Sequence, residues 1–230
     1  MSALPVPPAI AKIAPDGNLT PRQLRRFMIE MVARRIKPGT GSGHDFLRRR
    51  TAMNPWPDLR PILKGIQWAL IGGVATRAYM AERATKDMDI VVHEKDGQTA
   101  VKKLQDAGYQ ILSKLAIPGY LMQSPDGTEL DVLFGKYRWL KDALSQPKQD
   151  PAGYPVIALP YLVILKMEAQ RPQDWADISR MLGWASDREL DEVRAAIKKY
   201  APDDLEDLES LIFLGKKEQE IPPSTDEKQG

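Results

Sequence analysis

The sequence predicts an α+β protein: a mixed sheet of about five strands with flanking helices, a helical extension before it and a helical bundle after it. The chain of 230 residues is long enough for a sizeable core. Short apolar runs alternate with helical patterns in its middle, whereas helical patterns alone follow. We therefore divide the chain into a basic helical extension, a mixed core, a helical region and a polar tail, at residues 1–65, 66–158, 159–214 and 215–230.

The extension is expected to hold one long helix over residues 21–36, where apolar side chains recur at helical spacing. Thr20 is a suitable N-cap, because Pro21 fits the first helical position. The glycine-rich residues 37–43 end this helix, and a short helix is expected over residues 57–64. The apolar side chains are Leu24, Phe27, Met28, Met31 and Val32, and the arginines largely on the other side are Arg22, Arg25, Arg26 and Arg35.

In the core, Gly72 and Gly73 break the apolar run WALI and separate the first strand from the first helix. Gly108 is placed to end the second helix, and PDG at residues 125–127 is a good hairpin turn. The expected elements are a strand over 68–71, a helix over 74–82, a strand over 88–92, a helix over 97–107 and strands over 109–114, 119–124 and 128–134.

The helical region is expected to form a bundle of amphipathic helices. The segment GKKEQEIPPSTDEKQG that follows carries too little apolar surface to order itself, so a mobile tail is expected over residues 215–230. The expected helices cover residues 159–170, 172–184, 187–200 and 202–214.

Composition limits the classes of site that this chain can build. No apolar run approaches the roughly 18 residues of a membrane span, and the first residues lack the features of a signal peptide, so we expect a soluble cytoplasmic protein without a membrane partner. Cysteine is absent and the only histidines are His44 and His93, which excludes thiolate and histidine-rich metal sites. Any metal must then bind oxygen ligands, which Mg²⁺ and Mn²⁺ prefer.

Charge is unevenly distributed, although the net charge is only +2. Residues 1–66 contain 12 Lys and Arg against 4 acids, whereas residues 200–230 contain 3 against 9. A basic front end attracts polyanions such as RNA, and the arginines of helix 21–36 together with Arg48 to Arg50 would offer a phosphate-binding surface. The alternative is two solvated polar ends without a partner.

Asp87 and Asp89 lie on either side of Met88, just before a run of β-branched residues. Side chains alternate across a strand, so both aspartates point to one face. Two carboxylates about 4 Å apart repel by roughly 4 kcal/mol at an effective dielectric constant of about 20, so the pair needs a cation or a raised pKa. In TELDVLF, Asp131 shares a face with Glu129 and is the natural third ligand. Three carboxylates on adjacent strands can hold two metal ions for an in-line displacement at phosphorus.

Gly72 and Gly73 stand between a strand and an expected helix. Without side chains, they allow a phosphate to approach backbone N–H groups and the positive helix end, so this spot suits a triphosphate. Taken alone, a Gly-Gly after a strand is usually a turn, and an Asp-x-Asp at a strand edge is usually solvated. The order of strand, Gly-Gly, helix, Asp-x-Asp and a later strand with Asp is far less common by chance.

These residues resemble a known family. The stretch IGGVATRAYMAERATKDMDIVV is similar to the nucleotidyltransferase superfamily related to DNA polymerase β, and most similar to the AbiEii-like toxins of abortive-infection and toxin-antitoxin systems and their stand-alone relatives. The resemblance covers about residues 66–185, and the first 60 residues match no family that we recognise. The matching positions are Gly72, Gly73, Arg83, Thr85, Asp87 and Asp89 in the first motif, Asp131 in ELDVLF, and Lys166, Arg171, Asp174 and Asp177 in the helical segment.

The resemblance implies a polymerase β-like core and a two-metal transfer of a nucleoside monophosphate from an NTP. The NTP would bind at Gly72 and Gly73, with Asp87 and Asp89 on the Mg²⁺ or Mn²⁺ ions. Asp131 would hold the catalytic metal and help the acceptor hydroxyl lose its proton.

Five further positions have competing interpretations. Lys166 would meet the triphosphate as a point charge, or it is a helix lysine whose ammonium reaches solvent. Arg83 would pair with a phosphate or brace a neighbouring acid, and Thr85 would support the nucleotide site or hold the loop through a local backbone bond. Asp174 and Asp177 would assist the site, or they would only stabilise the start of their helix.

Three functions are compatible with these residues. The main hypothesis is transfer of a nucleoside monophosphate onto a hydroxyl of tRNA or of a protein, by a toxin or defence component that has a cognate antitoxin. The second is modification of a small molecule such as an antibiotic, which an acidic pocket for a cationic drug would favour. The third is a partner-binding module of the same fold without chemistry, against which the three intact acids count. No motif here encodes the choice of nucleobase.

Overall fold

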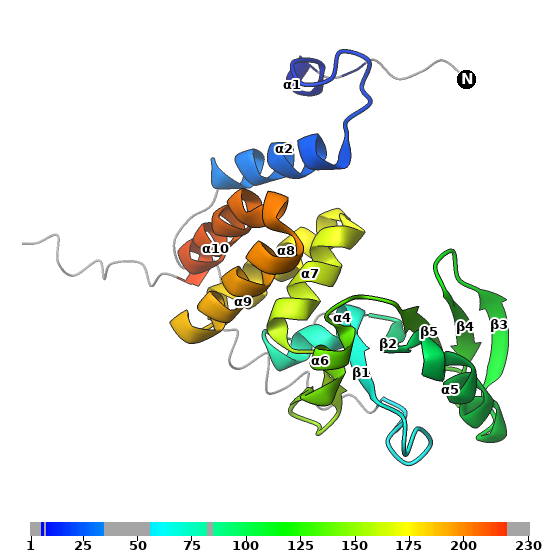
Figure 1. The fold of residues 1–230 in the computed structure, drawn as a ribbon. Coiled ribbons are helices and arrows are strands. Elements are labelled where there is room, and N and C mark those ends of the chain that lie inside the picture. Colours follow the sequence, from blue (N-terminus) through cyan, green and yellow to red (C-terminus); the bar gives the residue numbers. More distant parts are fainter. Residues whose placement is uncertain (1–5, 7, 35–55, 82–84, 220–230) are drawn as a thin grey trace, which may run out of the picture.

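A computed structural model describes residues 6, 8–34, 56–81 and 85–219 of the chain. Figure 1 shows a sheet with α5 (Glu94–Asp106) packed against it, and a helical bundle beside the sheet. The α2 helix lies along the outer side of this bundle (Figure 1). The predicted α+β class, with a mixed sheet, flanking helices and a helical region after it, is confirmed.

In the part of the chain that the structure describes, seven strands form one mixed sheet in the order β3-β4-β5-β2-β1-β7-β6. The two neighbours of β2 differ in direction, because β5 runs parallel to it and β1 antiparallel. The prediction of about five strands missed β6 and β7, which are too short to show any alternation. The strands are β1 (Trp68–Ile71), β2 (Asp87–His93), β3 (Gln110–Lys114), β4 (Gly119–Gln123), β5 (Glu129–Gly135), β6 (Lys148–Gln149) and β7 (Pro155–Val156).

The two faces of β2 have different surroundings. Met88, Ile90 and Val92 are buried. The ladder with β5 pairs Val92 with Phe134, and Gly97 of α5 lies directly against the Phe134 ring. These apolar side chains therefore form the face that α5 covers. The alternate positions of β2 point the other way, and they carry the acidic residues.

The segment that links β1 to β2 differs from its prediction. Instead of a helix over residues 74–82, a single helical turn, α4 (Gly72–Ala75), starts at the glycines and continues as the 3₁₀ turn η1 (Thr76–Ala78). The Thr76 hydroxyl donates a hydrogen bond to the Gly73 carbonyl oxygen at 2.8 Å. This side-chain bond closes the turn locally.

Two other helices also differ from the sequence pattern. Residues 60–65 form turns, so the short helix expected over 57–64 is wrong. The α5 helix begins at Glu94, earlier than expected, because His93 Nδ1 accepts a hydrogen bond from the Lys95 backbone N–H and caps it.

Among the described residues, four helices build the bundle that follows the sheet. Pro172 opens the second helix, and Ser186 forms a capping box with Glu189 at the start of the third. The helices are α7 (Leu159–Ala169), α8 (Pro172–Trp184), α9 (Asp187–Tyr200) and α10 (Leu205–Gln219), with the 3₁₀ turn η2 (Pro202–Asp204) before the last.

The α8 and α10 helices cross closely at two glycines. A Cβ atom on Gly215 would lie 1.9 Å from the Ser179 carbonyl oxygen, and one on Gly183 would lie 2.5 Å from the Gly215 carbonyl oxygen. Lys216 Nζ also donates a hydrogen bond at 2.6 Å to the backbone carbonyl at the end of α8. Residues 215–219, which the sequence assigned to the tail, are therefore helical. The rest of the predicted tail lies outside the described residues.

The α1 (Pro8–Ala11) and α2 (Pro21–Ala33) helices precede the sheet. Thr20 caps α2 as predicted, in a capping box with Gln23. The predicted last residues of this helix, like Arg48 to Arg50, lie outside the described part of the chain.

Arg25 and Arg26 of α2 form ion pairs with acidic residues near the start of α10. Arg25 is only 2% exposed, and its guanidinium bonds Asp204 and Asp207 at 2.6 Å each. Arg26 pairs with Glu206. The prediction that Arg25 contributes to an RNA-binding surface is wrong, because acids far along the sequence bury it.

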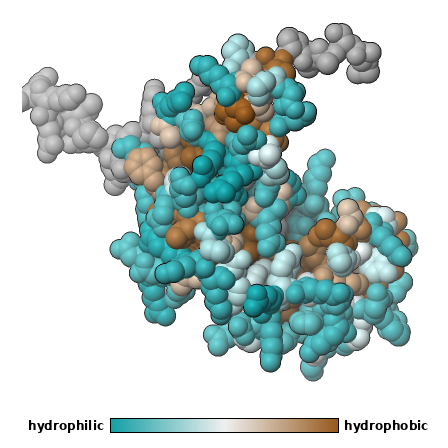
Figure 2. All heavy atoms as spheres, turned by 45° about the horizontal axis from the view of Figure 1, so that its top comes forward, coloured by the Kyte–Doolittle hydropathy of each residue, from teal (hydrophilic) through white to brown (hydrophobic). Residues whose placement is uncertain are grey.

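Figure 2 shows a largely hydrophilic face, with apolar side chains in small separate areas. Among the described residues, no helix is both long enough and apolar enough to cross a membrane. The large apolar side chains that are exposed are Ile13, Met31, Val32, Ile111, Leu112, Ile117 and Phe213.

Candidate active site

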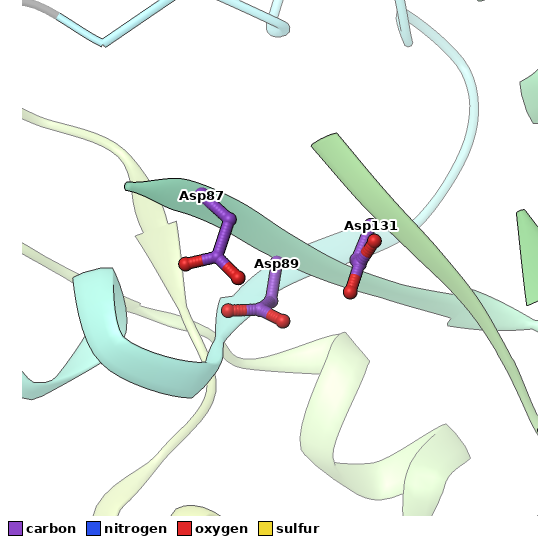
Figure 3. A group of neighbouring side chains, drawn as sticks. All are labelled: Asp87, Asp89 and Asp131. Atoms are coloured by element: carbon purple, nitrogen blue, oxygen red, sulfur yellow. The ribbon is translucent and has the colours of Figure 1, made fainter. Parts of the chain in front are cut away.

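Three aspartates converge on the face of the sheet that points away from α5 (Figure 3). Asp87 and Asp89 belong to β2, and Asp131 of β5 is paired with Asp89 in the parallel ladder. One carboxylate oxygen from each of the three lies within 4.8 Å of the others. Each side chain is partly exposed. The alternation of two neighbouring strands thus brings together the three acids that the sequence singled out.

The carboxylates of this triad destabilise one another's charge. Burial first, and then the charges of Asp87 and Asp131, raise the pKa of Asp89 to about 7. Burial, with the charges of Asp87 and Glu129, also raises the pKa of Asp131. A cation among these oxygens would relieve the repulsion, and an all-oxygen donor set suits Mg²⁺ or Mn²⁺. The residues present therefore fit a divalent metal.

Gly72 and Gly73 shape the turn beside the triad. Gly72 has a φ of +65°, and a Cβ atom there would lie 1.9 Å from Asp89 Oδ2. The Gly73 backbone N–H hydrogen bonds the Asp89 carboxylate. Only glycine combines that conformation with such a close approach. The long helix that would have given this turn a strong dipole does not form, since α4 is a single turn, and the Gly73 backbone N–H is directed at Asp89.

Thr85 supports the triad from the loop before β2. Its hydroxyl donates a hydrogen bond to Asp87 Oδ1 at 2.7 Å. The local bond that the sequence suggested therefore goes to a carboxylate instead of the backbone, and it fixes the orientation of Asp87. Arg83, the other predicted residue of this loop, lies outside the described residues.

Lys166 of α7 is enclosed by two carboxylates of α8. The residue is 3% exposed, and its Nζ atom lies 3.1 Å from Asp174 Oδ1 and 2.7 Å from Asp177 Oδ2. Both aspartates are fully buried. The interpretation of Lys166 as a lysine that reaches solvent is wrong. Its predicted contact with the triphosphate stays a prediction, and here its ammonium is occupied by the two aspartates.

Asp174 connects this buried pair to Arg171. Arg171 Nε donates to Asp174 Oδ2 at 2.7 Å, and its Nη2 donates to Asp174 Oδ1 at 3.2 Å. Burial opposes ionisation of Asp174, but the hydrogen bond from Arg171 and the charge of Lys166 hold its pKa below the ordinary value. Asp174 and Asp177 therefore do more than stabilise the start of α8, because they organise two cations.

Arg171 is a further residue near the site, and no role was predicted for it from the sequence. It stood in the matching motif, and its spacing of three residues before Asp174 at a helix start was the available signal. The charges of Asp89 and Asp87 contribute to the raised pKa of Arg171, and Arg171 in turn opposes the rise in the pKa of Asp89. Its guanidinium is thus electrostatically coupled to the triad.

Comparison with known proteins gives a limited likeness. No family model and no curated protein matches the chain. A crystal structure of ANT(2")-Ia in complex with adenylyl-2"-tobramycin is 15% identical, covers 67% of this chain and 92% of its own, and has a TM-score of 0.38. A poly(U) polymerase is 16% identical over 72% of this chain and 54% of its own, with a TM-score of 0.27.

A cytoplasmic RNA terminal U-transferase gives similar values: 16% identity, 79% of this chain, 55% of that chain and a TM-score of 0.25. All three are proteins that this chain resembles in part, and none of them is an AbiEii-like toxin. At these TM-scores the likeness carries no functional argument, so function is argued from the site.

Proposed function

We propose that this protein is a metal-dependent nucleotidyltransferase that moves a nucleoside monophosphate from an NTP to a hydroxyl acceptor. The observation that supports it most is the convergence of three carboxylates, two of them with raised pKa values, beside a glycine turn whose Gly73 backbone N–H bonds one of them. Structural acids are usually paired with cations, whereas these three lie together and form no ion pair with any cation of the described residues.

The residues of the chain have separate roles in this proposal. Asp87 and Asp89 hold the divalent ions, and Thr85 keeps Asp87 in the orientation that the site requires. Gly72 and Gly73 leave room for the phosphates of the NTP. Bound Mg²⁺ or Mn²⁺ would supply charge for the attacking and leaving oxygens of an in-line displacement.

Asp131 has the role of guiding the acceptor. It belongs to β5, on the side of β2 away from the glycine turn, because β1 and α4 lie on the other side. An in-line displacement places the attacking and leaving groups at opposite ends. With pyrophosphate leaving beside the glycine turn, the acceptor hydroxyl lies toward Asp131. Because its pKa is raised, the Asp131 carboxylate is a stronger base towards that proton than an ordinary aspartate.

For the acceptor, we propose a hydroxyl of tRNA or of a protein, in a cytoplasmic toxin or defence component with a cognate antitoxin. This rests on the resemblance of the first motif to AbiEii-like proteins. The burial of Arg25 removes one residue of the proposed RNA surface, and Arg22 on the same helix stays exposed. Modification of a small molecule such as an antibiotic is the alternative.

The test is transfer of label from each of the four α-³²P-labelled NTPs with Mg²⁺, using total tRNA, cell protein or an aminoglycoside as acceptor. The native protein should label one acceptor class, and the Asp87→Ala/Asp89→Ala variant should label none. Asp106→Ala is the matched control, since Asp106 is an exposed aspartate that pairs with Lys102 on α5. Equal labelling by the double variant would contradict the proposal, and the labelled acceptor decides between the alternatives.

A further inference from the structure

We propose that Arg171 is the side chain that binds the phosphates of the nucleotide at the triad, and that Lys166 is a positioning residue that acts on Arg171 through Asp174. This inference rests on the proposed function. It assigns the phosphate contact to a residue at the junction of α7 and α8, and it gives the motif lysine an indirect role.

Lys166 is poorly placed to bind a ligand. Its side chain is 3% exposed, and its ammonium already bonds two fully buried carboxylates. Moving it to a phosphate would leave Asp174 and Asp177 buried with less compensation, which strongly disfavours the move. The ammonium therefore stays where it is when a nucleotide binds.

Arg171 has the opposite exposure. Its side chain is 68% exposed, although Asp174, which holds it, is completely buried. Asp174 accepts from Nε and one Nη2 hydrogen, and no other described residue accepts from this guanidinium, so Nη1 and the second Nη2 hydrogen can bind a further acceptor. A guanidinium fixed along one edge is pre-organised to bind phosphate oxygens along the other.

The backbone directs Arg171 outward. Gln170 ends α7 with a φ of +58°, and it is the only residue other than glycine with a positive φ in the described ranges. Arg171 itself is extended, and Pro172 then starts α8. A left-handed conformation is strained for a residue other than glycine. That strain is retained at the residue that turns the chain between α7 and α8 and so sets the position of Arg171.

The charge of this guanidinium interacts with the charges of the triad. Asp89 and Asp87 both act on the charge of Arg171, and Arg171 acts on that of Asp89. An NTP held on the triad brings further negative charge to the same place. Lys166 neutralises Asp177, and it shares Asp174 with Arg171 through the two Asp174 oxygens. One buried carboxylate therefore connects the enclosed lysine to the exposed arginine.

The experiment measures binding of each NTP and of the matching nucleoside in the presence of Mg²⁺, by isothermal titration calorimetry. The variants are Arg171→Gln, Arg171→Lys, Asp174→Asn and Asp87→Ala/Asp89→Ala. The matched control is Arg180→Gln, because Arg180 is a half-exposed arginine of the same helix whose ion pair is with Glu218. Thermal melting of each variant verifies that it is folded.

Arg171→Gln should weaken binding of the preferred NTP about 10- to 100-fold, as expected for a charge-assisted hydrogen-bond pair, and leave nucleoside binding unchanged. Arg171→Lys should recover little of the lost NTP affinity, since a lysine ammonium cannot form the two-pronged hydrogen bond with Asp174 that orients the guanidinium. Asp174→Asn should weaken NTP binding, but less than Arg171→Gln does. It should also reduce the salt dependence of NTP binding, again less than Arg171→Gln does. A purely structural role of Asp174 would leave the salt dependence native.

Two results would overturn the inference, and they differ in meaning. If Arg171→Gln binds the NTP like the native protein while Asp87→Ala/Asp89→Ala has lost Mg²⁺-dependent binding, the proposed function stands and the assignment of Arg171 is wrong. If the native protein binds none of the four NTPs with Mg²⁺, both fail.

Discussion

Two groups of carboxylates in this protein have the same chemistry and opposite surroundings. Asp87, Asp89 and Asp131 face one another and form no ion pair with any cation of the described residues, and the pKa of Asp89 rises to about 7. Asp174 is less exposed to solvent than any of these three, yet the contacts of Arg171 and Lys166 lower its pKa. The difference shows that burial alone does not identify a functional acid. What identifies one is a charge that the fold leaves uncompensated.

The largest expected effect is on activity, in the group formed by Asp87, Asp89 and Asp131. Asp131→Asn keeps the shape of the side chain but removes its charge, so nucleotidyl transfer should fall by about three orders of magnitude or more, measured as label transferred per minute. Asp126→Asn, in the exposed turn before β5, is the matched control and should retain native activity. Activity within threefold of native in Asp131→Asn would remove that residue from the chemistry.

The next largest effect is on stability, at Asp174 and Asp177, whose buried charges are paired with Lys166. Lys166→Met leaves two buried carboxylates with less neutralisation, so the free energy of unfolding should fall by about 3–5 kcal/mol in chemical denaturation. Adding Asp177→Asn removes one of those charges and should restore part of the loss. A loss of less than 1 kcal/mol in Lys166→Met would show that the pair is not the buried ion pair described above.

Stability should depend on pH in opposite directions at the two groups. The pKa of Asp89 is raised on folding, so its contribution is fully present below about pH 4 and is lost as pH rises towards 7. The lowered pKa of Asp174 gives a contribution that is present at neutral pH and lost in acid. Asp89→Asn should therefore raise the free energy of unfolding at pH 8 in EDTA by about 1–3 kcal/mol, and do little at pH 4.

Mg²⁺ provides the internal check on that result. In melting curves at pH 8 with Mg²⁺, the native protein should recover the stability by which Asp89→Asn exceeds it in EDTA, because the ion neutralises the triad. An Asp89→Asn variant that is less stable than native at pH 8 in EDTA would mean that the carboxylate is compensated by something within the protein.

The smallest expected effect is at Thr85. Thr85→Val removes the hydroxyl that orients Asp87, a hydrogen bond of about 1 kcal/mol, so the Mg²⁺ concentration for half-maximal activity should rise about fivefold. Thr99→Val, at an exposed position of α5, should leave it unchanged. An unchanged Mg²⁺ requirement in Thr85→Val would show that Asp87 is oriented without this contact.

The triad could be predicted from the sequence because it follows from local patterns. Alternation in DMDIVV and in ELDVLF places each acid on a definite face, and pairing β2 with β5 brings Asp131 to Asp89. The sequence also predicted that Gly72 lies at the end of a strand, but it did not predict that Gly72 lies close to Asp89. That contact depends on the path of α4, which is a turn where a longer helix was expected.

What could not be predicted depends on contacts between distant segments. Arg25 has the sequence signature of a surface arginine, but acids some 180 positions later bury it. Gly215 stands at the start of a polar segment, yet it is the point where α10 meets α8. The enclosure of Lys166 likewise depends on how α7 and α8 pack, because its two partners lie on the next helix.

The most direct test of the account is titration of the protein with Mn²⁺, followed by electron paramagnetic resonance of the free ion at pH 6 and pH 8. The native protein should bind Mn²⁺ with an affinity that increases from pH 6 to pH 8, because the pKa of Asp89 is about 7. The Asp87→Ala/Asp89→Ala variant should lose this binding, and Asp106→Ala should keep it. Equal Mn²⁺ affinity in the native protein and the double variant would contradict the claim that these carboxylates form a metal site.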